Sequence, residues 1–594
     1  MENMRYRILA LLAVPLGLTA CLKDFEDTSF VPEKAVISWG EESKTLTKDA
    51  TSFELVLHSN LPWRITPSAS WLSVTPDRGL GDAVLTVKVT KNRTVEERRA
   101  YLRMSVTADQ YSDFPVIQGP AEGGDSNTYY VKADGDASAS GLSWTNATTL
   151  SAAIDQAADG DVIYVAAGTY FPEAFLENSD EKDLSNKTFQ IHSNFVLQGG
   201  FPATAEDASF DPVKDYDPSS NVTILSGAMD GGVSAYHVVT VTAATLDGKK
   251  ALLKGFTITG GKTGTVDKEG YMVGGSLVDK SRGGGLNVGA SRIDIEDCII
   301  SGNEAQMHAA GVFLNARGEV SMTACRIIAN ESKNNAGGIW NSGATLWMDR
   351  CTVAGNISGQ QAAGLYSINS EGVPSICRIF NSTFSGNDCT TVNASRSGGG
   401  AYIREFSDVV FVNCTFQGNK AGNGGAVQGY GGNGKTSRLS LISCTLSGNS
   451  ATVLGGGISL WNNYNTLNIY NCIISGNSAP SGENIGIGAN ANAPKLDYYT
   501  TIVGSGLFSQ TGSAVSGWTF DPATMLSAFG LWGGKTETFS LVDGAANPAA
   551  SEGMTREELA AIGAGFSPAV SASVFETDQR GVAREKNTIG STTL

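Results

Sequence analysis

Three acidic residues near the middle of the chain have the types and spacing that acid–base chemistry needs. Asp294, Glu296 and Asp297 form a compact acidic group, and Arg326 or Arg350 follows one or two repeats later. Carboxylates of this kind can hold Ca²⁺ while a basic side chain removes a proton from a substrate. Solvated charges at a turn explain the same residues equally well, so both interpretations stay open. Ca²⁺ is expected only if the first one holds.

Four aromatic residues recur at one position of successive repeats. The position follows a small-Gly-apolar motif and reads Asn287, Phe313, Trp340, Tyr366, Tyr402, Val427, Ser459. Aromatic rings stacked at strand spacing suit the apolar C–H faces of sugars. Phe313, Trp340, Tyr366 and Tyr402 are therefore candidates for binding a glycan or a protein partner. Aromatic residues favour strands in any case, so a covered structural patch is the alternative.

Composition argues against two other classes of site. The chain has only four His, and none falls within a group of Cys, so we expect no metal site and no cofactor. A net charge of −17 argues against nucleic acid as a partner.

These candidates depend on a repeat that runs from Cys298 to Asn477. A small residue is followed five positions later by Asn, while successive Asn lie 27, 26, 31, 32, 30 and 28 residues apart. Constant spacing within a repeat and variable intervals between repeats are typical of a solenoid. The matched pairs are Cys298 and Asn303, Cys325 and Asn330, Cys351 and Asn356, Ser382 and Asn387, Cys414 and Asn419, Cys444 and Asn449, Cys472 and Asn477.

Each repeat predicts three short strands separated by bends. An apolar-any-apolar triplet such as Ile293 to Ile295 precedes each small residue, which indicates a strand with one buried face. Two residues then turn the chain, a second strand follows and ends in Gly and Asn, and the small-Gly-apolar motif begins a third. The pattern predicts a right-handed parallel β-helix.

The repeated Asn and Cys have structural roles in this prediction. Asn tolerates left-handed backbone at a bend, and its amide can bond to the Asn above and below, so the seven Asn should form a ladder. Six of the nine Cys would fill one core column. The Cβ atoms of parallel neighbours lie about 4.8 Å apart, which is longer than the Cβ–Cβ distance in a disulfide. We therefore expect buried free thiols. Cys377 and Cys389 lie off the column, and whether they pair stays open.

Residues 1–20 read as a targeting segment. Arg5 and Arg7 precede an apolar run from Ile8 to Leu18 that is too short to span a membrane. Leu18-Thr19-Ala20-Cys21 resembles the lipobox of bacterial lipoproteins, which implies acylation of Cys21 and a linker over 21–35. The acidic residues after it resemble the surface-export signal of Bacteroidetes lipoproteins, which implies the outer face of the outer membrane. An ordinary secretory signal is the alternative.

Residues 36–118 alternate in short strands, which predicts an immunoglobulin-like β-sandwich. Trp63, Trp71-Leu72, Pro76, Gly79, Gly81, Asn92, Arg98 and Val116-Ile117-Gln118 resemble the BACON family, whose members are surface modules proposed to bind glycan or mucin. We expect Trp63 and Trp71 to lie in the core. Residues 119–127 read as a linker.

The β-helix is expected over 128–493, with an amphipathic capping helix from Thr149 to Ala158. The segment from Tyr130 through Ser143-Trp144 to Gly168-Thr169-Tyr170 resembles the pectate-lyase-like proteins classed as choice-of-anchor Q. The later Phe-Asn and Gly-Gly motifs resemble the repeats of polymorphic outer-membrane proteins. Residues 494–594 would end the β-helix and cap it. These families include lyases, hydrolases and adhesins, so the resemblance implies fold more than function.

Taken together, these features lead us to expect a lipid-anchored cell-surface protein of the all-β class that binds glycans or surface partners without catalysis. The first alternative is a polysaccharide lyase or glycoside hydrolase that acts in a β-helix groove. The second alternative is a structural stalk in the envelope.

Overall fold

The computed structural model describes residues 36–594 apart from 70, 93–96, 107–109, 121–125, 244–249, 371, 391–396, 433–434, 462–464, 489–494, 505–519 and 545. The expected targeting segment, Cys21 and the linker over 21–35 lie outside the described residues. Within the described part, none of the helices combines the length and the apolar character that a membrane span requires.

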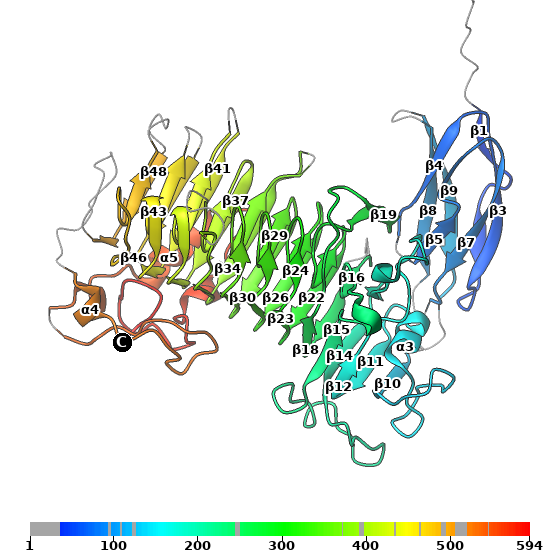
Figure 1. Ribbon diagram of the computed structural model, residues 1–594, viewed down its shortest axis with the longest axis horizontal. Helices are drawn as coiled ribbons and strands as arrows, with labels where there is room; N and C mark the ends of the chain where they lie inside the picture. Colours follow the sequence, from blue (N-terminus) through cyan, green and yellow to red (C-terminus); the bar gives the residue numbers. More distant parts are fainter. Residues whose placement is uncertain are drawn as a thin grey trace, which may run out of the picture.

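The N-terminal unit is a β-sandwich of two sheets (Figure 1). Trp63 and Trp71 are buried in its core, as expected for residues that hold the two sheets together. One sheet contains, in spatial order, β1 (Ile37–Trp39), β3 (Ser52–Ser59), β7 (Ala83–Val89) and β5 (Leu72–Thr75). The other contains β2 (Lys44–Leu46), β9 (Tyr111–Gln118), β8 (Arg98–Ser105), β4 (Pro62–Pro67) and β6 (Arg78–Leu80).

The rest of the chain is built on three long parallel sheets, which confirms the predicted parallel β-helix. The first sheet contains β10 (Thr128–Val131), β11 (Val162–Ala166), β14 (Val196–Phe201), β17 (Ala251–Lys254), β22 (Arg292–Glu296), β26 (Glu319–Thr323), β30 (Thr345–Asp349), β34 (Ser375–Phe380), β37 (Ser407–Val412), β41 (Ser437–Ile442), β45 (Asn465–Tyr470) and β48 (Lys495–Tyr499).

The second sheet contains β12 (Gly168–Tyr170), β15 (Thr223–Ser226), β18 (Phe256–Thr259), β23 (Ile299–Ser301), β27 (Arg326–Ile328), β31 (Thr352–Ala354), β35 (Thr383–Ser385), β38 (Thr415–Gln417), β42 (Thr445–Ser447), β46 (Ile473–Ile474) and β49 (Ile502–Val503). The third sheet contains β13 (Phe189–Ile191), β16 (Val239–Val241), β21 (Leu286–Val288), β25 (Val312–Leu314), β29 (Ile339–Ser342), β33 (Leu365–Ile368), β36 (Ala401–Ile403), β40 (Val427–Tyr430), β44 (Ile458–Trp461) and β47 (Ile485–Ile487).

Shorter elements decorate the coils. They are the hairpin of β19 (Gly270–Val273) and β20 (Ser276–Asp279), the bend strands β24 (Glu304–Ala305), β28 (Glu331–Ser332), β32 (Ile357–Ser358), β39 (Lys420–Asn423) and β43 (Ser450–Leu454), and the 3₁₀ turns η1 (Leu184–Asn186) and η2 (Asp230–Gly232).

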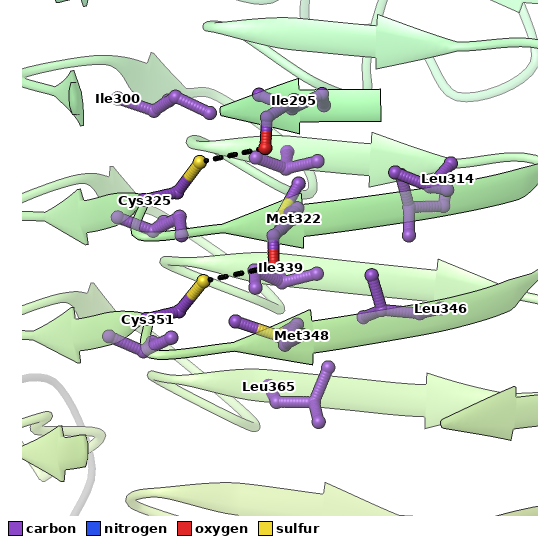
Figure 2. Packing of buried hydrophobic residues seen from close by; sticks show 14 of the residues in the cluster. Ile295, Ile300, Leu314, Met322, Cys325, Ile339, Leu346, Met348, Cys351 and Leu365 are labelled. Carbon is purple, nitrogen blue, oxygen red and sulfur yellow. Dashed lines mark hydrogen bonds between the residues drawn. The ribbon is translucent and has the colours of Figure 1, made fainter. Parts of the chain in front are cut away.

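The core of the β-helix is a file of apolar side chains that repeats from coil to coil (Figure 2). Cys325 and Cys351 lie in this file, and their thiols donate to the carbonyls of Ile295 and Met322, at 3.3 and 3.4 Å. The eight described cysteines form no disulfide with one another. Burial raises the pKa of the Cys325 thiol, which keeps it neutral.

Cys377 and Cys389 are buried in different places. Cys377 lies on β34 in the main core, opposite Leu346 and Val409 of the neighbouring strands. Cys389 packs with Ala363 and Ala421 in a separate small cluster.

The seven repeated asparagines form a continuous ladder of buried amides. Each Nδ2 donates to the Oδ1 of the Asn in the next coil, at 2.8 to 3.1 Å, and Asn477 extends the ladder to Asn484. The expectation of left-handed backbone at these Asn is wrong. The residue before each Asn takes positive φ instead, as Gly302 (64°) and Ala329 (52°) do.

The two ends of the β-helix differ from each other. Helix α3 (Leu150–Gln156) buries Leu150, Ala153 and Ile154 against the first coil, and Thr149 caps its N-terminus. At the other end, β48 and β49 extend the coils to Val503, within the segment expected to end the β-helix.

The C-terminal segment, residues 520–594, packs beside the coils (Figure 1). Leu559 and Phe575 pack on Val410, Val412 and Ile442, which point outward from the first sheet. The segment contains α4 (Pro522–Met525), η3 (Pro548–Ala550), α5 (Arg556–Ala564) and η4 (Ala572–Phe575).

A polar network ties this segment to the outer face of the second sheet. Gln579 donates to Thr383 (2.8 Å) and accepts from Thr415 (2.7 Å), and Ser591 donates to Thr445 (3.0 Å). The fully buried Arg378 of β34 donates to the carbonyl of Pro568 at 2.9 Å. These threonines cannot bond to solvent because the segment covers them.

Candidate functional site

The aromatic column predicted from the sequence exists, but it is buried. The exposed fractions are 2% for Phe313, 8% for Trp340, 2% for Tyr366 and 4% for Tyr402. The ring centroids follow one another at 6.2, 4.7 and 5.5 Å, and Tyr430 continues the column at 6.4 Å. The expectation that these rings face solvent is therefore wrong, and the structure has the covered patch that was the alternative.

Bend residues cover the column. Ala309, Ala336 and Ala362 take positive φ and pack on the rings. The guanidinium of Arg282 lies 5.5 Å from the ring of Phe313 and 5.3 Å from that of Trp340. Only a rearrangement of the bends would expose a ring face to a sugar.

At its other end the column is closed by Arg404, which lies 5.1 Å from the ring of Tyr430 and donates to the hydroxyl of Tyr366 at 3.0 Å. The next outward residue is Gln428, because the register pairs it with Tyr402. Val427, which the sequence placed in the column, lies in the core.

The acidic group lies on the first sheet and is paired with lysines. Lys250 contacts Asp294 and Lys254 contacts Glu296, each at 3.0 Å. The acids therefore do not converge with Arg326, which lies on β27 in the second sheet. Each lysine neutralises a carboxylate of the following coil.

The remaining acid of the group, Asp297, accepts a hydrogen bond from the hydroxyl of Tyr216 at 2.9 Å. Arg350, the second basic candidate, pairs with Asp349. Among the described residues, no three His, Cys, Asp or Glu side chains come together as a metal site would require.

A cavity of about 690 Å³ lies between the coils and the C-terminal segment. We call it the side cavity. It is lined by Asp349, Arg350, Asn381, Gly533, Gly534, Lys535, Thr577, Asp578, Gln579, Arg580 and Gly581. Its size is in the range of small-molecule sites, and its lining combines charged and polar side chains with three glycines.

The coil side of the side cavity is a pair of bends after β30 and β34. Arg350 and Asn381 take positive φ (52° and 49°), which turns their side chains outward at the same place in successive coils. Asn381 donates to Asp349 at 2.8 Å, and Asn413 of the next coil donates to Asn381 at 3.1 Å. Stacking of the coils therefore fixes this wall.

The opposite wall belongs to the C-terminal segment. Arg580 donates twice to Asp578, at 2.9 and 2.7 Å, and this ion pair is almost completely buried. Gly534 lies so close to Arg580 that an added Cβ would be 2.8 Å from its Cα. Only glycine allows this approach, which places Lys535 on the rim.

An exposed tryptophan stands next to this wall. Trp532 is 44% exposed and directly precedes Gly533, so the two Cα atoms are about 3.8 Å apart. Its indole Nε1 donates to the carbonyl of Ala528 at 3.0 Å, which orients the ring. Leu531 beside it is 65% exposed. Two exposed apolar residues thus directly precede the glycines of the cavity wall in the chain.

The sandwich carries a second exposed aromatic surface. Arg103 lies between the rings of Tyr101 and Tyr111, at 5.2 and 4.0 Å from their centroids. Asp113 accepts two hydrogen bonds from Arg103, at 2.8 and 2.7 Å, and holds the guanidinium flat on β8.

Sequence analysis did not single out the side cavity. Its lining joins two bends of the repeat to a segment without a repeat, and this contact leaves no periodic signal. The available signal was Trp532-Gly533-Gly534-Lys535, where an aromatic residue and a cation flank two glycines outside any predicted strand.

Comparison with known protein families supports the N-terminal sandwich. Residues 61–119 match the BACON family model, described as a putative binding domain, N-terminal, which confirms the resemblance over these residues. A comparison with curated proteins finds no match.

Three solved structures are similar over part of the chain. Pectate lyase Pel9A is 13% identical, with TM-score 0.39, over 67% of this chain and 84% of its own. A rhamnogalacturonan lyase is 13% identical, with TM-score 0.27, over 66% and 85%. The Bacteroides ovatus GH5 xyloglucanase is 14% identical, with TM-score 0.14, over 35% and 45%. Likenesses of this size assign no activity to the chain.

Proposed function

We propose that this chain is a lipid-anchored cell-surface protein that binds carbohydrate through the side cavity, with the β-helix as a rigid scaffold and without catalysis. The carboxylates Asp349 and Asp578 are held by Arg350 and Arg580. Because both carboxylates are engaged in these ion pairs, neither is free to contact a reacting atom, and the cavity suits binding better than acid–base chemistry.

The observation that carries this proposal is that the exposed Trp532 directly precedes Gly533, which lines the side cavity. Sugar rings present apolar C–H faces and polar hydroxyls together, and they therefore suit an aromatic face next to planar polar groups. Arg350 and Lys535 supply donors at the rim of the cavity, which lies outside the core of the β-helix. Among the described tryptophans, Trp532 is the one with a large exposed area.

The match of residues 61–119 to a putative binding domain supports a binding role for the whole chain. The names of the pectate lyase and the rhamnogalacturonan lyase indicate that these two enzymes act on polysaccharides. Their TM-scores are too low to support an argument about this chain. The proposal therefore depends on the cavity.

Substitution of Trp532 tests the site. Trp532→Ala should weaken binding to the glycans that the wild-type protein retains on an array by about tenfold or more, because the apolar platform is lost. Phe171→Ala is the matched control, since Phe171 is an exposed aromatic residue and neither it nor its chain neighbours line the cavity. Equal retention by Trp532→Ala and wild type would remove the side cavity as the site, and retention of no glycan by wild type would end the proposed function.

The anchor is tested separately. If Cys21 is acylated, Cys21→Ser should abolish incorporation of an alkyne-labelled fatty acid and release the protein from the membrane fraction. Protease added to whole cells should digest the anchored wild-type protein if it is on the outer face. Unchanged fatty-acid labelling of Cys21→Ser would contradict the anchor.

A further inference from the structure

The side cavity holds more positive charge than its carboxylates can neutralise. Three cations line it, Arg350, Lys535 and Arg580, against two carboxylates, Asp349 and Asp578. This local excess is unusual for a chain with a net charge of −17. It indicates what kind of ligand the cavity favours.

Both carboxylates are already engaged. The two oxygens of Asp349 accept from Arg350 Nε and from Asn381 Nδ2, each at 2.8 Å. Asp578 is fully buried and accepts from the side chain of Arg580 and from backbone N–H groups, including that of Thr593 at 2.8 Å. Neither carboxylate is left to bind a cation or a sugar hydroxyl strongly.

Two of the cations still have donors to offer. Arg350 has five N–H groups, and Asp349 takes only the one at Nε, so its terminal nitrogens remain available. Lys535 is exposed, and no described carboxylate lies within ion-pair distance of it. Arg580 differs, because Asp578, Ser540 and the carbonyl of Thr593 use its guanidinium.

We propose that the carbohydrate bound in the side cavity is acidic, with a carboxylate or sulfate group that Arg350 and Lys535 hold while Trp532 supports a sugar ring. The planar fork of Arg matches two oxygens of such a group, and Lys adds a point charge. This inference rests on the proposed function and specifies the ligand class of the same site.

Carboxylate and sulfate present the same anionic oxygens, so matched polymers must separate them. Polygalacturonate carries carboxylates, and its full methyl ester is the neutral form of the same backbone. Dextran sulfate carries sulfates, and dextran is its neutral form. Binding of each polymer by the detergent-solubilised full-length protein is measured by biolayer interferometry.

At least one acidic polymer should bind about tenfold more tightly than its neutral form. Arg350→Gln and Lys535→Gln should each reduce that preference severalfold, and raising NaCl from about 0.05 to about 0.5 M should weaken it. Arg317→Gln and Lys182→Gln are matched controls that leave it unchanged, because both residues are exposed and outside the cavity, and Arg317 also has positive φ.

Two results separate the inference from the proposed function. If neutral polymers bind as tightly as acidic ones and only Trp532→Ala weakens binding, the inference is wrong and the proposed function stands. If Arg350→Gln and Lys535→Gln leave binding of the acidic polymers unchanged, the inference is also wrong. If the wild-type protein binds no carbohydrate, both the inference and the proposed function are wrong. Circular dichroism spectra that match wild type show that each variant is folded.

Discussion

The buried asparagines of the ladder are satisfied by the neighbouring coils. Asn330 donates to Asn356 in the next coil and to the carbonyl of Ile300 in the previous one, at 3.1 and 2.9 Å. Each such bond contributes about 1 kcal/mol, whereas a buried amide left without a partner costs about 1–3 kcal/mol. The asparagine must therefore recur in every coil, and this is why it can be read from the sequence.

His237 is a buried residue with a measurable consequence for stability. Burial lowers its pKa from 6.5 to about 4. Its Nδ1 contacts the carbonyl of Gly283 at 2.9 Å, which requires a proton there, and Nε2 has no protein partner. The neutral ring is therefore the folded form.

The unfolded chain takes up a proton at His237 as pH falls below 6.5, whereas the folded protein does so only near pH 4. The contribution of the neutral His237 ring to the free energy of unfolding is complete above pH 6.5. It is lost as the pH falls from 6.5 to 4, and the free energy of unfolding falls by about 3 kcal/mol over that range. The urea midpoint should therefore fall between pH 7 and 5, and less steeply in His237→Asn. His308, whose pKa burial also lowers to about 4, adds to the wild-type slope. Identical slopes for the two proteins would contradict the assignment.

At the scale of the elements, the bends explain what sequence could and could not predict. The strands of the seven repeats followed from apolar alternation and from the spacing of Asn, because stacking repeats both. The identity of the left-handed residues did not follow, since Ala324 and Arg350 take positive φ where Gly or Asn would be expected. Stacking of adjacent coils stabilises those conformations from outside the local sequence.

The candidate site was harder to predict for a related reason. Outward positions on a strand can be counted, and Trp340 was placed outside the core correctly, yet covering residues such as Arg282 come from a bend whose path is irregular. A one-residue shift in the Gly motif likewise placed Val427 where Gln428 lies. Burial of an outward side chain depends on distant segments, and a repeat pattern contains no information about them.

At the scale of the whole molecule, the sandwich is fixed to the first coil of the β-helix. Arg98 of β8 contacts Asp159 at 2.8 Å, and both side chains are almost completely buried. Arg98 also lies 4.4 Å from the ring of Trp71, and Asn194 donates its backbone N–H to Asp159 at 2.8 Å. The ion pair thus connects the core of one unit to the end of the other.

Replacing Arg98 should uncouple the two units. Arg98→Ala leaves the buried carboxylate of Asp159 without its cation, which costs about 3–5 kcal/mol. We expect faster cleavage by protease within residues 119–127 and a separate thermal transition for the sandwich. Arg99→Ala is the matched control, because the Arg99 side chain is 70% exposed and its ion-pair partner within the described part of the chain is Glu97. A single unchanged transition in Arg98→Ala would show that the units are joined in another way.

The position of the C-terminal segment has a consequence for biogenesis. The coils can fold in order from the N-terminus as the polypeptide leaves the ribosome, because each coil needs only the preceding coil to pack against. Residues from 554 onward cover Val410, Val412 and Ile442. These three side chains therefore stay exposed until the last part of the chain has been synthesised. Until translation delivers it, the stacked coils expose an apolar flank, and binding of that flank by a chaperone would matter most in that interval.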